Sequence, residues 1–337
     1  MQISRAQSLL RAAVDARRIP GYAVLIGRGD GVLLREAYGC AQWIPSEMPM
    51  TVDTLFDLAS LTKVTAVWPL ILRLLDAGAL ALDTRWPAAM GLPPEKYPHL
   101  SQTTIFQLLT HTAGLTEFMD TEGGSREERL ESLYRAPLKY APGEQAVYSD
   151  LSFIFLGEIA ARQLGMPLDR AVGAVFGPLG MRDTMFNPPR EKYAFAATEI
   201  RAGQTLPVYG TVHDERARQL GGVAGHAGLF SHVDDMGRFA HAILLGHEAL
   251  PGAWVARSLA NQTEHLGGNR ALGWVVYRQR PGGNIVGHTG FTGTSLWLDA
   301  RDMCYCVLLT NRVHPSRANA ELGAIREALF CAVFGEE

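Results

Sequence analysis

The sequence lacks a surplus of positive charge and any apolar run of membrane length. Its 31 lysines and arginines are outnumbered by 34 aspartates and glutamates, so no excess of cations is available to bind a phosphate backbone. No apolar run approaches the roughly 20 residues that a membrane-spanning helix needs. These absences argue against nucleic acid as a partner and against a membrane span.

The sequence also lacks paired-cysteine motifs and a signal-peptide pattern. None of its four cysteines stands in C-x-x-C or zinc-ligand spacing, and Cys304 and Cys306 lie two apart in one apolar strand, too close to bridge comfortably. The N-terminal residues Met-Gln-Ile-Ser-Arg lead straight into a helical pattern, with no apolar segment of the signal-peptide type. We therefore expect a cytoplasmic protein whose thiols are reduced and packed.

What the sequence does contain is enough apolar residues, 47% of 337, for a substantial core. Strand-like runs occur near both ends of the chain, with a mainly helical stretch between them. This order predicts an α+β fold with a central antiparallel sheet built from both chain ends. We expect an α/β unit at residues 1–78 and 202–337, a helical insertion at 79–201, and an active site in the cleft between them.

The strongest local signal for chemistry is Ser60 followed by Lys63 at the start of an apolar helix at 61–75. Side chains three apart share a helix face, and a lysine beside a serine can serve as its base. Pro69 predicts a kink or a tightened turn in this helix. The motif alone is weak, because an N-cap serine followed by a chance lysine gives the same pattern.

Two further motifs follow in order along the chain. Tyr148-Ser149-Asp150 opens a helix at 151–164, where Ser149 or Asp150 could simply be a helix cap. His288-Thr289-Gly290 ends a strand-like run, where it could simply be a turn. Each motif is weak alone, but the three in this order form a strong pattern.

With these motifs, the chain resembles the serine β-lactamase and penicillin-binding protein superfamily, in particular its class C-like branch, which includes D-alanyl-D-alanine carboxypeptidases and family VIII esterases. The resemblance covers nearly the whole chain and implies a β-lactamase/DD-peptidase-like fold with an all-helical subdomain. It implies that Ser60 is the acylated nucleophile and that Lys63 and Tyr148 handle protons. The remaining residues that it assigns to substrate binding are Asp150, His226, His288, Thr289, Gly290 and Phe291, with the amides of Ser60 and Phe291 as the oxyanion hole.

Two residues depart from the family pattern. Asp150 stands where the family often has asparagine, and its charge should favour the protonated form of Lys63 and shift the role of base toward Tyr148. His288 replaces a lysine, and its ordinary pKa of about 6.5 predicts weak, pH-dependent binding of substrate carboxylates, strengthening toward pH 6. Both changes favour short-chain esters over β-lactams.

Two functions remain open at this point. The first is a serine hydrolase that acts on small esters, D-amino-acid peptides or β-lactams. The second is a penicillin-binding or sensing module that is acylated without turnover, or is not acylated at all. Neither function uses a cofactor. A metal cluster of His213, His226 and His232 is disfavoured, since the sequence has no H-E-x-x-H motif.

Overall fold

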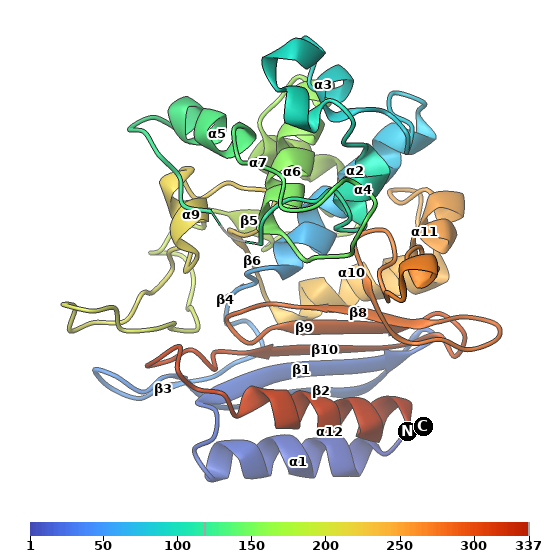
Figure 1. Cartoon of the computed structure of the whole chain (residues 1–337). Helices are drawn as coiled ribbons and strands as arrows, with labels where there is room; N and C mark the ends of the chain where they lie inside the picture. The colour runs from blue at the N-terminus through green and yellow to red at the C-terminus, as the bar shows by residue number, and fades with distance from the viewer. Residues whose placement is uncertain (118, 336–337) are drawn as a thin grey trace.

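A seven-stranded antiparallel sheet forms the centre of the computed structural model, which describes residues 1–117 and 119–335 (Figure 1). The central strands β1 and β10 pair with each other, so both ends of the chain build one sheet, as the sequence predicts. The α+β fold class is thereby confirmed. In spatial order the strands are β3 (Met48–Pro49), β2 (Gly31–Gln42), β1 (Gly21–Arg28), β10 (Cys304–Thr310), β9 (Ser295–Asp299), β8 (Ile285–Thr289) and β7 (Val275–Arg278).

Helices cover both faces of this sheet (Figure 1). Helices α1 (Ile3–Asp15) and α12 (Leu322–Phe334) pack on one face, and α10 (Val233–Leu245) packs on the other. Because neighbouring strand residues point to opposite faces, β1 contributes to two cores: Val24 lies in the core beneath α1 and α12, and Leu25 in the core beneath α10. Burial on both faces explains why the predicted central strands are continuously apolar.

The rest of the chain is mainly helical and lies on the α10 side of the sheet (Figure 1). A small three-stranded sheet, in the order β4-β6-β5, joins this part to the strands. No helix within 1–117 or 119–335 has the length and apolar character to cross a membrane. The remaining elements are β4 (Phe56–Asp57), η1 (Lys63–Val67), α2 (Trp68–Asp76), α3 (Trp86–Ala89), η2 (Pro94–Lys96), η3 (Pro98–Leu100), α4 (Ile105–Leu109), α5 (Arg126–Tyr134), α6 (Asp150–Leu164), α7 (Leu168–Ala171), α8 (Gly173–Phe176), β5 (Met185–Phe186), α9 (Glu215–Gln219), β6 (Leu229–Ser231), α11 (Gly252–Ser258) and η4 (Glu264–Leu266).

The buried helix after Ser60 departs from the expected geometry. Pro69 lacks an N–H, so it cannot donate to the carbonyl of Thr65 one turn earlier, and its ring crowds that carbonyl. The chain responds with the π-helical turn η1, in which the Trp68 amide donates to the carbonyl of Lys63. The turn before Pro69 is thus widened, whereas the sequence suggested a kink or a tightened turn. Widened turns of this kind are frequent at functional sites.

Two glycines allow the loop at 221–228 to pack directly on α6. A Cβ atom built on Gly225 would lie 1.9 Å from the backbone oxygen of Phe153, and one built on Gly157 would lie 2.9 Å from the Cα of Gly225. Only glycine permits this approach of the two backbones. The contact fixes the loop that carries His226 relative to the helix that begins at Asp150.

We expect Gly225→Ala to lower the free energy of unfolding by about 2 kcal/mol or more, because the added methyl group must displace backbone atoms in a packed core. Chemical denaturation measures this change. Gly173→Ala is the matched control, since no neighbouring atom lies within 4 Å of the position that its added methyl group would occupy. Equal stabilities of the two variants would show that the packing of this loop on α6 is loose.

Candidate functional site

A cleft of about 640 Å³ opens beside Ser60. Ser60 is in the turn between β4 and η1, Tyr148 and Asp150 are at the start of α6, and the 288–291 segment spans the end of β8 and the turn after it. The fold therefore brings the three sequence motifs together around one cavity. Of the residues that the sequence singled out, those lining the cleft are Ser60, Tyr148, Asp150, His288, Thr289, Gly290 and Phe291, whereas Lys63 and His226 lie buried behind its wall.

The Ser60 hydroxyl contacts both residues expected to handle its proton. Its Oγ accepts a hydrogen bond from Lys63 Nζ at 2.9 Å and another from the Tyr148 hydroxyl at 2.9 Å. Ala59, directly before it, has a φ of +46°, an uncommon conformation for a residue with a side chain. The three groups are close enough to exchange a proton, and the strained turn presents the hydroxyl to the cleft.

Two backbone amides at the cleft, which the resemblance assigns to an oxyanion hole, are left without an acceptor among the residues that the structure describes. Those of Ser60 and Phe291 donate no hydrogen bond within the described part of the chain. The neighbouring Gly290 amide is instead used, donating to the carbonyl of Thr294 at 2.7 Å. A Cβ atom on Gly290 would lie 2.4 Å from the carbonyl of Leu58, so the end of β8 can reach the serine turn only with glycine there.

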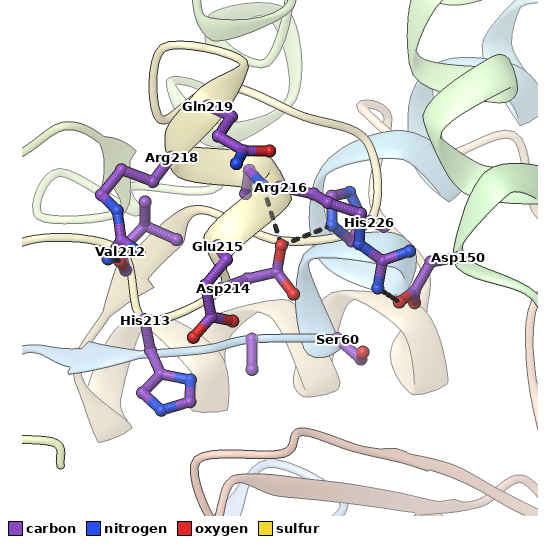
Figure 2. A network of polar contacts seen from close by, with 12 residues as sticks. Ser60, Asp150, Val212, His213, Asp214, Glu215, Arg216, Arg218, Gln219 and His226 are labelled. Carbon is purple, nitrogen blue, oxygen red and sulfur yellow. Dashed lines mark hydrogen bonds and ion pairs between the residues drawn. The ribbon is translucent and has the colours of Figure 1, made fainter. Parts of the chain in front are cut away.

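Lys63 is completely buried and is held by three acceptors. Besides Ser60 Oγ, its ammonium group donates to Asp150 Oδ1 at 2.8 Å and to the backbone carbonyl of His226 at 3.1 Å. The second oxygen of Asp150 accepts a hydrogen bond from Arg216 at 2.9 Å (Figure 2). Asp150 therefore bridges two cations, an arrangement that the serine–lysine motif alone does not indicate.

These contacts determine the protonation states at neutral pH. Burial lowers the pKa of Lys63, but the charge of Asp150 and the nearby Tyr148 more than offset it, and the net pKa is raised. Burial has the opposite effect on Tyr148: it raises the pKa of the hydroxyl, and the charge of Lys63 only partly offsets this increase. The direction for Lys63 agrees with the expectation from Asp150. The resting site thus holds a charged lysine and a neutral tyrosine, and this pair must lose a proton before it can act as a base.

The pH dependence expected from His288 is wrong. Burial, reinforced by the cations Lys63 and Arg270, lowers the pKa of His288 to about 3. Its Nδ1 lies 3.0 Å from the carbonyl oxygen of Thr289, which fits a neutral ring that carries its proton on Nδ1. His288 stays uncharged between pH 5 and 8, so it cannot strengthen the binding of carboxylates as the pH falls toward 6.

Asp214 and His226 support the site from behind. His226 Nε2 lies 2.9 Å from Asp214 Oδ1, and Figure 2 shows its ring turned toward Asp214. The side chain of His226 is buried and does not line the cleft, so the structure does not support its predicted contact with substrate; its backbone carbonyl accepts a hydrogen bond from Lys63, and its ring lies close to Asp150. His213, which the sequence analysis considered only in a disfavoured metal cluster, lines the cleft and stacks on Phe291 at 5.6 Å.

Several residues that sequence reasoning missed shape the site. His111 accepts a hydrogen bond from the Ser149 amide at 3.2 Å and packs its ring on Tyr148 at 4.8 Å. Arg270 also lines the cleft, and the Cζ atom of its guanidinium lies 5.6 Å from the centre of the Tyr148 ring. Neither stands at a spacing from Ser60 that a motif could have revealed, because both reach the site through tertiary packing.

One group of side chains in the described residues has the spacing of metal ligands. Single ligand atoms of Asp150, Asp214 and His226 lie within 4.8 Å of one another. However, Asp150 already binds the cations Lys63 and Arg216, whose charges oppose a metal ion in the same place. This set of residues does not fit a metal centre.

We expect Asp150→Asn to move the pH profile of Ser60 acylation to lower pH by about one unit or more, because removing the carboxylate charge lowers the pKa of Lys63. The rate of labelling by a fluorophosphonate, measured from pH 5 to 10, tests this shift. Glu215→Gln removes another carboxylate from the same cleft and should leave the profile in place. An unchanged profile in Asp150→Asn would contradict the role given to this charge.

Comparisons with known proteins place the chain in a family. The β-lactamase family model matches residues 6–330. A relative from Salmonella paratyphi A, named "putative D-alanyl-D-alanine carboxypeptidase", is 28% identical over 369 aligned positions that cover 95% of this chain and 85% of the relative.

Solved structures show the same fold. EstCE1, described as a hydrolase with promiscuous acyltransferase activity, superposes with a TM-score of 0.75 at 24% identity over 97% of this chain and 98% of its own. A class C β-lactamase superposes with a TM-score of 0.78 at 19% identity over 99% of this chain and 97% of its own. The family match, the shared fold and the serine–lysine–tyrosine geometry lead to one conclusion. The chain belongs to the β-lactamase family of serine hydrolases.

Proposed function

We propose that this protein hydrolyses small esters, D-amino-acid peptides or β-lactams through an acyl intermediate on Ser60. The observation that carries the proposal is the Ser60 Oγ atom, which lies 2.9 Å from both Lys63 Nζ and the Tyr148 hydroxyl at the edge of the cleft. A serine hydroxyl is a weak nucleophile unless an adjacent group takes its proton. This contact supplies two such groups.

The roles in acylation follow from the protonation states. Once the Lys63–Tyr148 pair has lost a proton, Tyr148 takes the proton of Ser60 while Asp150 keeps Lys63 charged. Ser60 Oγ then bonds to the substrate carbonyl carbon, and the amides of Ser60 and Phe291 stabilise the oxyanion. Tyr148 passes the proton to the leaving group as the bond to it breaks. Water, deprotonated by the same pair, then releases the acid and restores Ser60.

The proposed site lies between the two units expected from the sequence. Tyr148 and Asp150 come from the 79–201 insertion, whereas Ser60 and His288 come from the unit formed by 1–78 and 202–337. A site built from both units would form only when they pack together. The division of the chain at these boundaries is part of the proposal.

We expect a fluorophosphonate or a penicillin to label the wild-type protein at one site, and Ser60→Ala to abolish the labelling with its circular dichroism spectrum unchanged. Intact-protein mass spectrometry measures the added mass. Ser152→Ala removes a buried serine from the adjacent helix and should keep full labelling. Labelling that persists in Ser60→Ala would refute the proposed nucleophile.

The alternative is a sensing module that is acylated once and not turned over. The observations that favour it are Asp150 and His288, which replace the asparagine and the lysine of related sites. Burst kinetics with p-nitrophenyl esters and a chromogenic cephalosporin separate the two functions. Continued turnover after the burst identifies a hydrolase, and a single stoichiometric burst identifies the sensor.

The position of Arg270 favours substrates that carry a carboxylate. It is half-buried at the cleft, and among residues 1–117 and 119–335 no carboxylate forms an ion pair with it. Burial lowers the pKa of Arg270, yet a guanidinium remains a cation throughout the physiological range. It can therefore provide the fixed positive charge that neutral His288 does not, which removes the main reason for expecting weak binding of anionic substrates.

We expect Arg270→Gln to lower kcat/KM by about tenfold or more for esters with a free carboxylate, because a charge-assisted hydrogen bond contributes about 1.5–3 kcal/mol. Matched methyl esters should lose little. Arg317→Gln is the control, since the charge of Arg317 is already neutralised by Glu199 and Glu215. Equal losses for the charged and the neutral substrates would exclude Arg270 as a carboxylate-binding residue.

A further inference from the structure

Asp57, three residues before Ser60, is a buried carboxylate without a role in the chemistry described above. Its side chain is only 2% exposed. One carboxylate oxygen accepts a hydrogen bond from the Ala59 amide at 2.8 Å, and the other accepts one from the His213 amide at 2.6 Å. Asp57 thus connects the turn that presents Ser60 to the loop that supplies His213 to the cleft.

The backbone of the same segment connects to a third wall of the cleft. The Thr292 hydroxyl donates to the carbonyl of Asp57 at 2.7 Å, and the Thr294 hydroxyl donates to the carbonyl of Leu58 at 2.9 Å. Thr292 directly follows Phe291, whose amide is one of the two proposed oxyanion donors. Displacing the 57–59 segment would therefore alter the position of Ser60 and its amide relative to the Phe291 amide.

Neither a neutral nor a smaller residue reproduces these contacts. Two amides approach the side chain from different loops, and only an ionised carboxylate offers each of them an acceptor oxygen. An asparagine would direct its NH₂ group at one of the amides. The amide of Ala59 is of special importance, since that residue has a φ of +46° and needs a partner to hold this conformation.

The charge of Asp57 does not serve the stability of the fold. Burial raises the pKa of Asp57 to about 6, as does the negative charge of Asp214, whereas the amides of His213 and Ala59 and the charge of Arg201 lower it. Since the folded pKa exceeds the ordinary value of about 4, ionisation of Asp57 makes the folded state less stable as the pH rises from 4 to 6. A role limited to folding would not require this charge.

We infer that Asp57 is a positioning residue for acylation: its carboxylate holds the Ser60 turn in register with the His213 loop and the Phe291 amide. This inference rests on the proposed acylation of Ser60. A displacement of a nucleophile by about 1 Å can lower a rate by about 100-fold, so the effect of losing these contacts should be measurable.

Asp57→Asn tests the inference by separating rate from stability. We expect its rate constant for acylation by a fluorophosphonate at pH 8 to fall by about 10- to 100-fold, with labelling still reaching one group per molecule. Asp235→Asn is the matched control, because Asp235 is equally buried and bridges the Asp183 amide and the Thr184 hydroxyl away from the cleft. The control should lose stability and keep its acylation rate.

The wild-type pH profile provides a second test that needs no variant. Protonation of Asp57 should make the acylation rate fall more steeply below about pH 6 than above it. In Asp57→Asn the additional steepness should disappear. If Asp57→Asn does not fold, the wild-type profile decides, and a profile without a break near pH 6 overturns the inference.

The outcomes distinguish this inference from the proposed function. Loss of labelling in Ser60→Ala together with a wild-type rate in folded Asp57→Asn would refute positioning by Asp57 alone. Labelling that persists in Ser60→Ala would refute the acylation of Ser60, and with it the basis of the inference. A slow Asp57→Asn beside a fast Asp235→Asn supports both.

Discussion

The buried ion pair between Lys63 and Asp150 is the interaction on which the site depends. A lysine without water contact would normally lose its proton, and the adjacent carboxylate is what keeps it charged. Arg216 in turn compensates the second oxygen of that carboxylate. Ion pairs thus link elements that lie far apart in the chain. Each of these groups alone would be a buried ion without a partner, which is energetically costly.

This charge arrangement also assigns different tasks to the two neighbours of Ser60. In the proposed mechanism, Lys63 provides a fixed positive field close to the developing charge, while Tyr148 is the group whose proton moves. Lys63 lies one tight turn after Ser60, where its amide donates to the Ser60 carbonyl at 3.1 Å, and its side chain is not exposed to the cleft. A substrate therefore meets the tyrosine and the serine, and the lysine acts on it only through its field and its hydrogen bond.

Much of the fold could be predicted from the sequence because its elements are encoded locally. The Asp30-Gly31 pair marks the hairpin between β1 and β2, and apolar spacing marks α1 and α12. The three motifs were also sufficient to predict that Ser60, Lys63 and Tyr148 lie close together. The pKa of His288 could not be predicted, because it depends on burial and on Arg270, which approaches from a loop with no sequence link to the motif. Asp57 was passed over for the same reason, since its second partner, His213, is distant in the chain.

The pairing of β1 with β10 delays completion of the central sheet until late in synthesis. Tyr22 lies opposite Thr310, so β1 pairs at once with β2 on one side but must wait for almost all of the polypeptide before β10 exists on the other. Contacts between such distant segments slow folding, because a very large loop has to close first. On the ribosome, Ser60 therefore emerges long before the 288–291 segment that lines the same cleft, so the proposed site can form only once most of the chain has been made.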